Sequence, residues 1–174
     1  MAETGDIHIR ETGRTGRITL ARPKALNALT YDMAMAIEVV VEDWQASGEI
    51  DLILIDAEGE KAFCAGGDIA QMYATGTRGD YTYGRKFWAD EYRLNAAIAD
   101  CAIPYVAVMD GIVMGGGAGL SVHGSHRIVT ERTLFAMPEC GIGLVPDVGG
   151  TYLLSRAPGK LGEYLGATSL RMNA

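Results

Sequence analysis

The sequence YVAVMDGIVMGGGAGL, residues 105–120, contains the pattern that decides the fold. Tyr105–Met109 is a short, continuous apolar run, which is typical of a buried β-strand. The glycines Gly115–Gly117 follow, and the residues from Ala118 to about His123 are expected to form a short helix. Because glycine lets the backbone turn sharply or approach another group closely, this stretch predicts a strand that leads through a glycine turn into a helix.

The same construction occurs earlier in the chain. Leu52–Ile55 is another buried apolar run, and it leads to the sequence FCAGGDI, residues 63–69. The first N–H groups of a helix have no partner inside the helix, and glycine lets a ligand come close to them. One such site can bind an anion, whereas two that converge on one oxygen atom form an oxyanion hole. Tight turns and helix–strand packing would require the same glycines, so spacing alone leaves that alternative open.

Common phosphate-binding motifs do not explain these glycines. Residues 115–120 fail the dinucleotide pattern GxGxxG because Leu120 stands where the third glycine belongs, and GxxxxGK[ST] does not occur. The formal net charge of −7 argues against a general affinity for nucleic acids or acidic membranes, both of which need a basic surface. We therefore expect neither nucleic acid nor a membrane among the partners.

The remaining pattern predicts an α/β protein with mixed strand pairing. At 174 residues the chain has the length of one domain with a core of its own. Strands and helices alternate along most of it, as in the α/β class. Further strands are expected at Ile7–Arg10, Arg17–Ala21, His126–Thr130 and Leu134–Ala136, and helices from Thr30 to about Ala46, Asp80 to Asp100, Asp147 to Arg156 and Leu161 to Leu165.

Neither a metal site nor a targeting segment is expected. The three cysteines form no CxxC pair, and His123 and His126 have no further ligands nearby in sequence, so we interpret them as ordinary polar residues. Residues 1–13 lack the features of a signal peptide. The most apolar stretch, residues 103–120, is too interrupted to span a bilayer. The expected location is the cytoplasm of a bacterium or the mitochondrial matrix of a eukaryote.

The sequence FAMPECGIGLVPDVGG, residues 135–150, adds two carboxylates. Glu139 lies in an apolar stretch rich in glycine and proline, which offers few polar neighbours. Such surroundings raise the pKa of a carboxyl group, so Glu139 is a candidate general acid or base. Asp147 is close in sequence, but it also precedes a predicted helix, and an N-cap would explain its residue type equally well.

These three segments, in this order and at these distances, resemble the crotonase (enoyl-CoA hydratase/isomerase) superfamily. The sequence RPKALNAL, residues 22–29, is similar to the first motif of that family. The resemblance covers residues 1–174 and implies an acyl-CoA-binding catalytic core, built as a spiral of β-β-α units with mixed sheets and surrounding helices. Family members continue into C-terminal helices that close the acyl pocket and mediate subunit contacts. We therefore expect a homo-oligomer and a core that lacks those helices here.

The resemblance also implies roles for individual residues. The backbone N–H groups of Gly67 and Gly116 would form an oxyanion hole. Coenzyme A would enter as part of the substrate, and no tightly bound cofactor is implied. The residues expected along the substrate's coenzyme A moiety are Lys24 and Ala25 in the first motif, and Ala65, Gly66, Asp68 and Ile69 in the second.

Departures from the family pattern indicate the subfamily. Hydratases of this superfamily use two glutamates, whereas this chain keeps the later one as Glu139 and has Gly119 in place of the first. Glu139 together with Asp147, and Glu91 in DEYRLNAAI, is similar to the 3-hydroxyisobutyryl-CoA hydrolases. The implied reaction is hydrolysis of a short-chain 3-hydroxyacyl-CoA thioester in valine catabolism. Glu139 would attack or activate water, Asp147 would orient it, and Glu91 would bind the substrate.

Two alternatives stay open from the sequence. Hydration or double-bond isomerisation within the same superfamily could use Glu139 alone. A non-catalytic module that binds acyl-CoA would also use the glycine segments.

Overall fold

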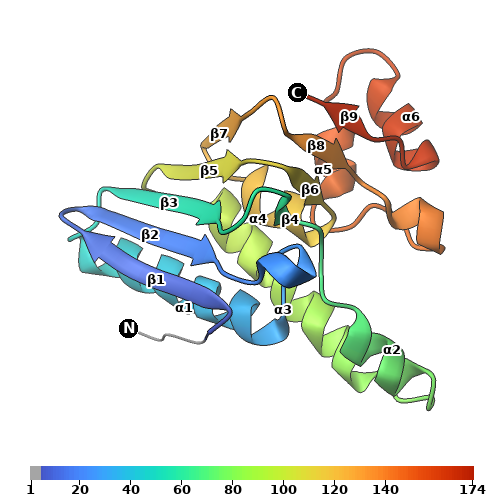
Figure 1. Ribbon diagram of the computed structural model, residues 1–174, viewed down its shortest axis with the longest axis horizontal. Coiled ribbons are helices and arrows are strands. Elements are labelled where there is room, and N and C mark those ends of the chain that lie inside the picture. Colours follow the sequence, from blue (N-terminus) through green and yellow to red (C-terminus); the bar gives the residue numbers. More distant parts are fainter. Residues whose placement is uncertain (1–4) are drawn as a thin grey trace.

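The computed structural model of the chain describes residues 5–174 and contains two β-sheets (Figure 1). The five-stranded sheet has the order β1-β2-β3-β5-β7, and the four-stranded sheet has the order β4-β6-β8-β9. The strands are β1 (Ile7–Thr12), β2 (Thr15–Leu20), β3 (Leu52–Ala57), β4 (Ala62–Cys64), β5 (Tyr105–Met109), β6 (Ile112–Met114), β7 (His126–Val129), β8 (Leu134–Ala136) and β9 (Met172–Asn173). Residues 1–4, part of the stretch in which we expect no signal peptide, lie outside the described residues.

The two sheets are linked strand by strand. β1 and β2 form the predicted antiparallel hairpin, and β2, β3, β5 and β7 pair in parallel. Each of β3, β5 and β7 is followed in the chain by a short strand of the second sheet, and these short strands, β4, β6 and β8, also pair in parallel. This repeated succession of a long and a short strand confirms the expected α/β class and the spiral of β-β-α units.

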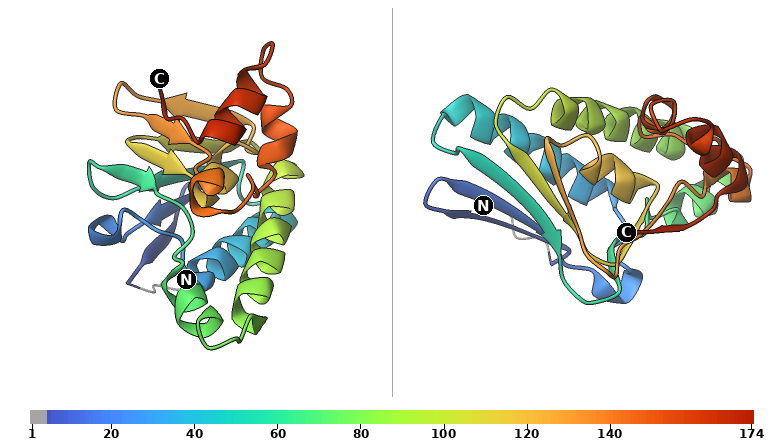
Figure 2. Two further views of the ribbon diagram at one scale, coloured as in Figure 1. Left: turned by 90° about the vertical axis from the view of Figure 1, so that its right-hand side faces the viewer. Right: turned by 90° about the horizontal axis from the view of Figure 1, so that it is seen from above.

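Helices cover one face of the five-stranded sheet (Figure 2). The helices are α1 (Tyr31–Ser47), α2 (Ala70–Gly76), α3 (Thr82–Ala99), α4 (Gly116–Ser121), α5 (Gly150–Leu154) and α6 (Leu161–Thr168). The main core lies between this sheet and the helices α1 and α3, with buried side chains from all three. In residues 5–174, no helix has both the length and the apolar character that a bilayer crossing requires.

In helix α1 the local sequence determines where the helix begins and ends. The Thr30 side chain accepts a hydrogen bond from the Met33 N–H at 3.2 Å, and the helix ends at Gly48, whose φ is 65°. Threonine is a preferred N-cap residue, and a glycine in the left-handed region commonly ends a helix, so both signals are readable in the sequence. Of the apolar residues at helical spacing in α1, Met33, Ile37, Val41 and Trp44 are buried, and Val40 is partly buried.

Several local predictions were wrong. The long strands do not run directly into the glycine turns, because the three-residue strands β4 and β6 intervene. Helix α4 begins at Gly116 rather than Ala118. The helix expected to begin at Asp147 begins at Gly150, and its N-cap residue is Gly149, with no side-chain cap. The C-terminal residues, for which the sequence suggested no element, contain strand β9, which pairs with β8.

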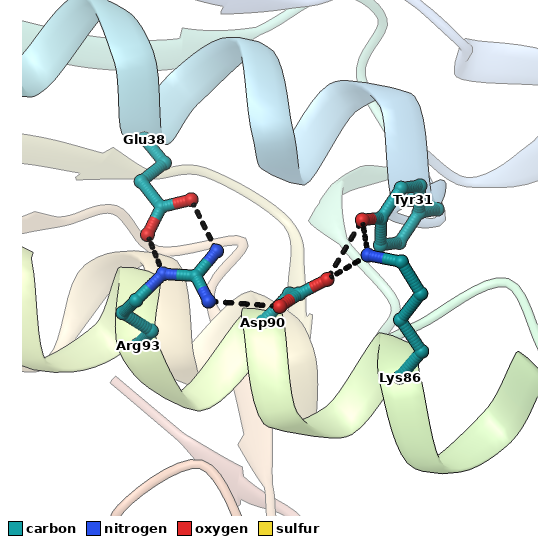
Figure 3. Close-up of polar contacts among 5 residues, drawn as sticks. All are labelled: Tyr31, Glu38, Lys86, Asp90 and Arg93. Atoms are coloured by element: carbon teal, nitrogen blue, oxygen red, sulfur yellow. Dashed lines mark hydrogen bonds and ion pairs between the residues drawn. The ribbon is translucent and has the colours of Figure 1, made fainter.

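A polar network ties α3 to α1 (Figure 3). The Arg93 guanidinium donates to both carboxylate oxygens of Glu38, at 2.5 and 2.9 Å, and to Asp90 at 2.8 Å. Asp90 also accepts from the Tyr31 hydroxyl at 2.7 Å and from the Lys86 ammonium at 2.6 Å. Hydrogen bonds from Lys86, Tyr31 and Arg93 hold the pKa of Asp90 well below its usual range. The network fixes the position of α3 on α1.

Two helical glycines give a matched test of how closely helix α4 packs against strand β4. A Cβ on Gly117 in α4 would collide with the carbonyl of Cys64 in β4, whereas a Cβ on Gly76 in α2 would find its nearest neighbour at 3.8 Å. We expect Gly117→Ala to destabilise the fold by roughly 1–3 kcal/mol, because α4 must move away from β4. Gly76→Ala should be neutral or stabilising by up to about 1 kcal/mol. Urea unfolding of both variants tests this, and equal stabilities would contradict the packing described.

Candidate functional site

A pocket of about 170 Å³ lies where the glycine segments, α3 and residues 138–147 meet. Most of the residues predicted for the site line it, although they come from distant parts of the chain. Its lining comprises Ala65, Gly66, Gly67, Ile69, Met72, Phe87, Trp88, Glu91, Gly115, Gly116, Pro138, Glu139, Ile142, Leu144 and Asp147.

Gly67 and Gly116, the residues predicted to form an oxyanion hole, both line this pocket. Leu29 donates to the carbonyl of Gly66 and accepts from the N–H of Asp68, both at 2.8 Å, so the N–H of Gly67 between them faces away from Leu29. Gly116 is the first residue of α4, where a helix leaves its N–H groups unpaired. Neither amide donates a hydrogen bond within residues 5–174. A Cβ on Gly116 would lie 3.2 Å from the Gly67 nitrogen, so the two glycines are neighbours.

Glu91 projects from α3 toward the start of α4. It is 3% exposed, and its Oε1 atom has no hydrogen-bond partner among the described residues. Its Oε1 would lie 2.6 Å from a Cβ on Gly116, so the carboxyl group lies directly against this glycine. Burial, together with the charges of Asp147 and Glu139, raises the pKa of Glu91 to about 8. At neutral pH most Glu91 side chains therefore carry a proton and can donate a hydrogen bond.

Glu139 faces the same pocket from a single 3₁₀ turn, Glu139–Ile142. It is 5% exposed, and its Oε2 atom has no hydrogen-bond partner in the described chain. Burial raises the pKa of Glu139 to about 7, with a smaller contribution from Asp147. A carboxyl group with this pKa is present in both protonation states near neutral pH, as general acid–base chemistry requires. The sequence-based expectation of a raised pKa is confirmed.

Asp147 completes a set of three carboxyl groups around the pocket. Its Oδ2 atom accepts a hydrogen bond from the Tyr92 hydroxyl at 2.7 Å. Burial, followed by this hydrogen bond, raises the pKa of Tyr92. The side chain of Asp147 thus points toward α3 and does not cap α5, which removes the N-cap interpretation. Within residues 5–174, no group of three or more His, Cys, Asp or Glu side chains is arranged to hold a metal ion.

Three of the predicted substrate-binding residues lie outside the pocket. Lys24 and Ala25 are exposed in a 3₁₀ turn, and Lys24 lines a separate hollow beside residues 58–62. Asp68 forms an ion pair with Arg22 at 3.0 Å, and its Oδ1 accepts from the N–H of Ala70 at 3.2 Å. Ala65, Gly66 and Ile69 line the pocket itself.

Two neighbours of the site were not predicted from the sequence. Tyr92, for which packing on a helix face is the default interpretation from sequence, is 41% exposed, and its hydroxyl donates to Asp147. Asn95 was not considered. It is 5% exposed, and neither its Nδ2 nor its Oδ1 atom has a hydrogen-bond partner in the described chain. The sequence could have indicated Asn95, because residues four apart in a helix share one face and Asn95 follows Glu91 by four positions.

Comparison with known proteins places this arrangement in a family. The model of the family described as enoyl-CoA hydratase/isomerase matches residues 15–174. The chain belongs to the enoyl-CoA hydratase/isomerase family. Among curated proteins of this family, it is 51% identical to a 3-hydroxyisobutyryl-CoA hydrolase, mitochondrial, from Gallus gallus. That similarity covers 96% of this chain and 43% of the relative, so the chain spans less than half of the relative's length.

Solved structures of the family have the same fold. An enoyl-CoA hydratase from Rhodobacter sphaeroides is 54% identical, with a TM-score of 0.95 over 97% of this chain and 50% of that chain. A carnitinyl-CoA dehydratase from Mycobacterium thermoresistibile is 46% identical, with a TM-score of 0.94 over 98% of this chain and 50% of that chain. The names of these relatives include a hydrolase, a hydratase and a dehydratase. Family membership therefore leaves the choice of reaction to the residues of the site.

The raised pKa of Glu91 makes a prediction about stability. Folding raises this pKa from 4.5 to about 8, so the folded state binds the proton more tightly. The resulting stabilisation is complete below pH 4.5 and is lost as the pH rises through about 8. Glu91→Gln stays neutral, so its free energy of unfolding should fall less between about pH 5 and about pH 9 than that of the wild type.

Urea unfolding across this pH range provides the measurement. The matched control is Glu60→Gln, which changes an exposed glutamate far from the pocket lining. Its pH dependence should follow that of the wild type. If Glu91→Gln also follows the wild type, the burial of an unpaired Glu91 carboxyl group is contradicted.

Proposed function

We propose that this chain carries the catalytic core of a hydrolase for short-chain 3-hydroxyacyl-CoA thioesters, with 3-hydroxyisobutyryl-CoA from valine breakdown as substrate. The observation that carries the proposal is one pocket in which Glu139 and Asp147 face the unpaired amides of Gly67 and Gly116. The curated relatives named 3-hydroxyisobutyryl-CoA hydrolase support the choice of substrate.

In the proposed reaction, the thioester carbonyl oxygen lies between the N–H groups of Gly67 and Gly116. Negative charge develops on this oxygen in the transition state, and preorganised donors stabilise it without reorganising. Removing one donor from such a site typically costs about 10²- to 10³-fold in rate. Both amides are available to donate to this oxygen, because neither donates a hydrogen bond elsewhere in the described chain.

The three carboxyl groups have different roles in the proposed reaction. On one route, ionised Glu139 attacks the thioester carbon and expels the coenzyme A thiolate, and water then hydrolyses the resulting acyl-glutamate anhydride. On the other route, Glu139 deprotonates the water that attacks this carbon, the C–S bond breaks, and Glu139 returns the proton to the leaving thiolate. Asp147, held by the Tyr92 hydroxyl, orients Glu139 and the incoming water. Glu91 is largely protonated at neutral pH and donates a hydrogen bond to the hydroxyl group of the acyl chain.

In this proposal the coenzyme A part of the substrate runs from the pocket, where Ala65, Gly66 and Ile69 line its path, to the surface beside Lys24, Ala25 and Asp68. The Lys24 ammonium attracts its phosphate groups. No further cofactor is required, and the acyl-CoA thioester is the partner. The mitochondrial relatives support the mitochondrial matrix as the location in a eukaryote, and a bacterial protein would act in the cytoplasm.

The experiment measures release of free coenzyme A from 3-hydroxyisobutyryl-CoA by the natural protein that carries this chain. We expect Glu139→Gln to lower kcat by on the order of 10²- to 10⁴-fold while substrate binding is retained, because the variant loses its base or nucleophile. Glu131→Gln, an exposed change in the loop between β7 and β8, serves as the matched control and should leave kcat unchanged.

Hydration of crotonyl-CoA, followed in parallel, separates the alternatives. Hydration or isomerisation without release of coenzyme A would replace the hydrolase by another reaction of the family. Binding of acyl-CoA without turnover would favour the non-catalytic module. Near-normal hydrolysis by Glu139→Gln would remove the assigned role of Glu139.

A further inference from the structure

Val148, the residue after Asp147, has an unusual backbone conformation. Its φ is 45°, in the left-handed region that β-branched residues rarely adopt. It is also 2% exposed, so its side chain is fixed in the interior against Ala118 and Met137. Backbone strain of this kind persists only where the surrounding structure imposes it, and it occurs preferentially at functional sites.

The side chain of His123 holds this conformation in place. Its Nε2 atom lies 2.6 Å from the carbonyl oxygen of Val148, and a carbonyl only accepts, so Nε2 carries the proton. The neutral Nε2–H tautomer and the imidazolium both make this bond. Gly149 lies against the imidazole ring, since a Cβ at this position would be 2.5 Å from Cε1 of His123. The ring therefore contacts the chain directly after Asp147 through one hydrogen bond and one packing contact.

His123 also links the backbone after Asp147 to the helix that begins at Gly116. Helix α4 runs from Gly116 to Ser121, and His123 follows its last residue by two positions. Gly119 in the same helix lies against Val148, because a Cβ on Gly119 would be 2.9 Å from the Val148 Cβ. One end of this short helical unit thus presents the Gly116 N–H, and the other end fixes the backbone that carries Asp147.

We propose that His123 is a positioning residue for Asp147, acting through the Val148 carbonyl. The inference rests on the proposed function, because Asp147 has its catalytic role only there. His123 does not touch the pocket, and its contribution is to keep the Asp147 carboxylate at a fixed place relative to Gly116. From the sequence, His123 and His126 were interpreted as ordinary polar residues. In this proposal, His123 has a specific positioning role.

Two substitutions separate the hydrogen bond from the ring contact. His123→Phe keeps an aromatic ring against Gly149 but has no donor, whereas His123→Gln supplies an N–H donor without the ring. We expect His123→Phe to lower kcat by about 10- to 100-fold with little change in KM, as expected when a reacting group is displaced. His123→Gln should recover most of the loss. His126→Phe, at an exposed position in β7, is the control and should retain wild-type kcat.

The outcome that overturns the proposal is a His123→Phe variant with a kcat close to that of the wild type. A His123→Gln variant as impaired as His123→Phe would also overturn it, because restoring an N–H donor would then fail to restore the position of Asp147.

A second readout does not depend on activity. The Tyr92 hydroxyl donates to Asp147, and this bond contributes to the raised pKa of Tyr92. If His123 fixes Asp147, the phenol of Tyr92 should ionise at lower pH in His123→Phe, as it should in Asp147→Ala. NMR titration of the protein with ¹³C-labelled tyrosine, assigned with Tyr92→Phe, measures this.

An unchanged Tyr92 titration in a folded His123→Phe variant would contradict the positioning role. This result is distinguishable from failure of the proposed function, in which Glu139→Gln and Asp147→Ala retain hydrolysis whatever the titration shows.

Discussion

The close approach of backbone segments at glycine residues is the constraint on which the rest of the structure depends. Helix α4 lies so near β4 and α3 that a side chain at Gly117 would meet the Cys64 carbonyl, and one at Gly116 would meet the Glu91 carboxyl group. Because these side chains are absent, the first amide of α4 lies beside the amide of Gly67. The arrangement of the pocket is therefore a consequence of packing between main chains, which side-chain rearrangement cannot easily disturb.

Helix α3 carries two adjacent carboxyl groups whose surroundings favour opposite protonation states. Asp90 faces α1 and receives hydrogen bonds from Lys86, Tyr31 and Arg93, which favour its ionised form. Glu91 faces the pocket, where its Oε1 has no partner in the described chain and burial favours the protonated form. The network in Figure 3 thus anchors the helix on one side, while the other side keeps a carboxyl group that is costly to ionise. A substrate that pairs with this group would gain the interaction that the free protein lacks.

The long elements could be predicted from the sequence because each carries its own signals. Helix α1 has a cap at Thr30, a stop at Gly48 and apolar residues at helical spacing, and β5 was predicted with its observed bounds. The strands β4 and β6 were not predicted, because each has only three residues and lies just before glycines that the sequence assigns to turns, whereas β8, of equal length, was predicted with its observed bounds. They form through parallel pairing with each other and with β8, which depends on segments distant in sequence.

Site residues could be predicted where the residue type and its sequence neighbours indicate the chemistry. They could not be predicted where contacts between distant segments determine a residue's role. Glu139 was found because an apolar stretch offers a carboxyl group few partners. Asp147 stayed ambiguous, since a residue before a helix and a residue in a pocket look alike until the bond to Tyr92 is known. His123 was assigned no role, because its contact with Val148 joins residues 25 positions apart. Asp68 lies next to pocket residues in sequence, but its pairing with Arg22 places it outside.

The convergence of the Gly67 and Gly116 amides on one substrate oxygen is the central claim. Vibrational spectroscopy tests it most directly, using the Glu139→Gln variant of the natural protein with 3-hydroxyisobutyryl-CoA labelled with ¹³C at the thioester carbonyl. Two hydrogen bonds to the carbonyl oxygen weaken the C=O bond, so its stretching frequency in the complex should lie below that in water. A frequency equal to or above the value in water would show that the amides do not hold this oxygen, and would contradict the account.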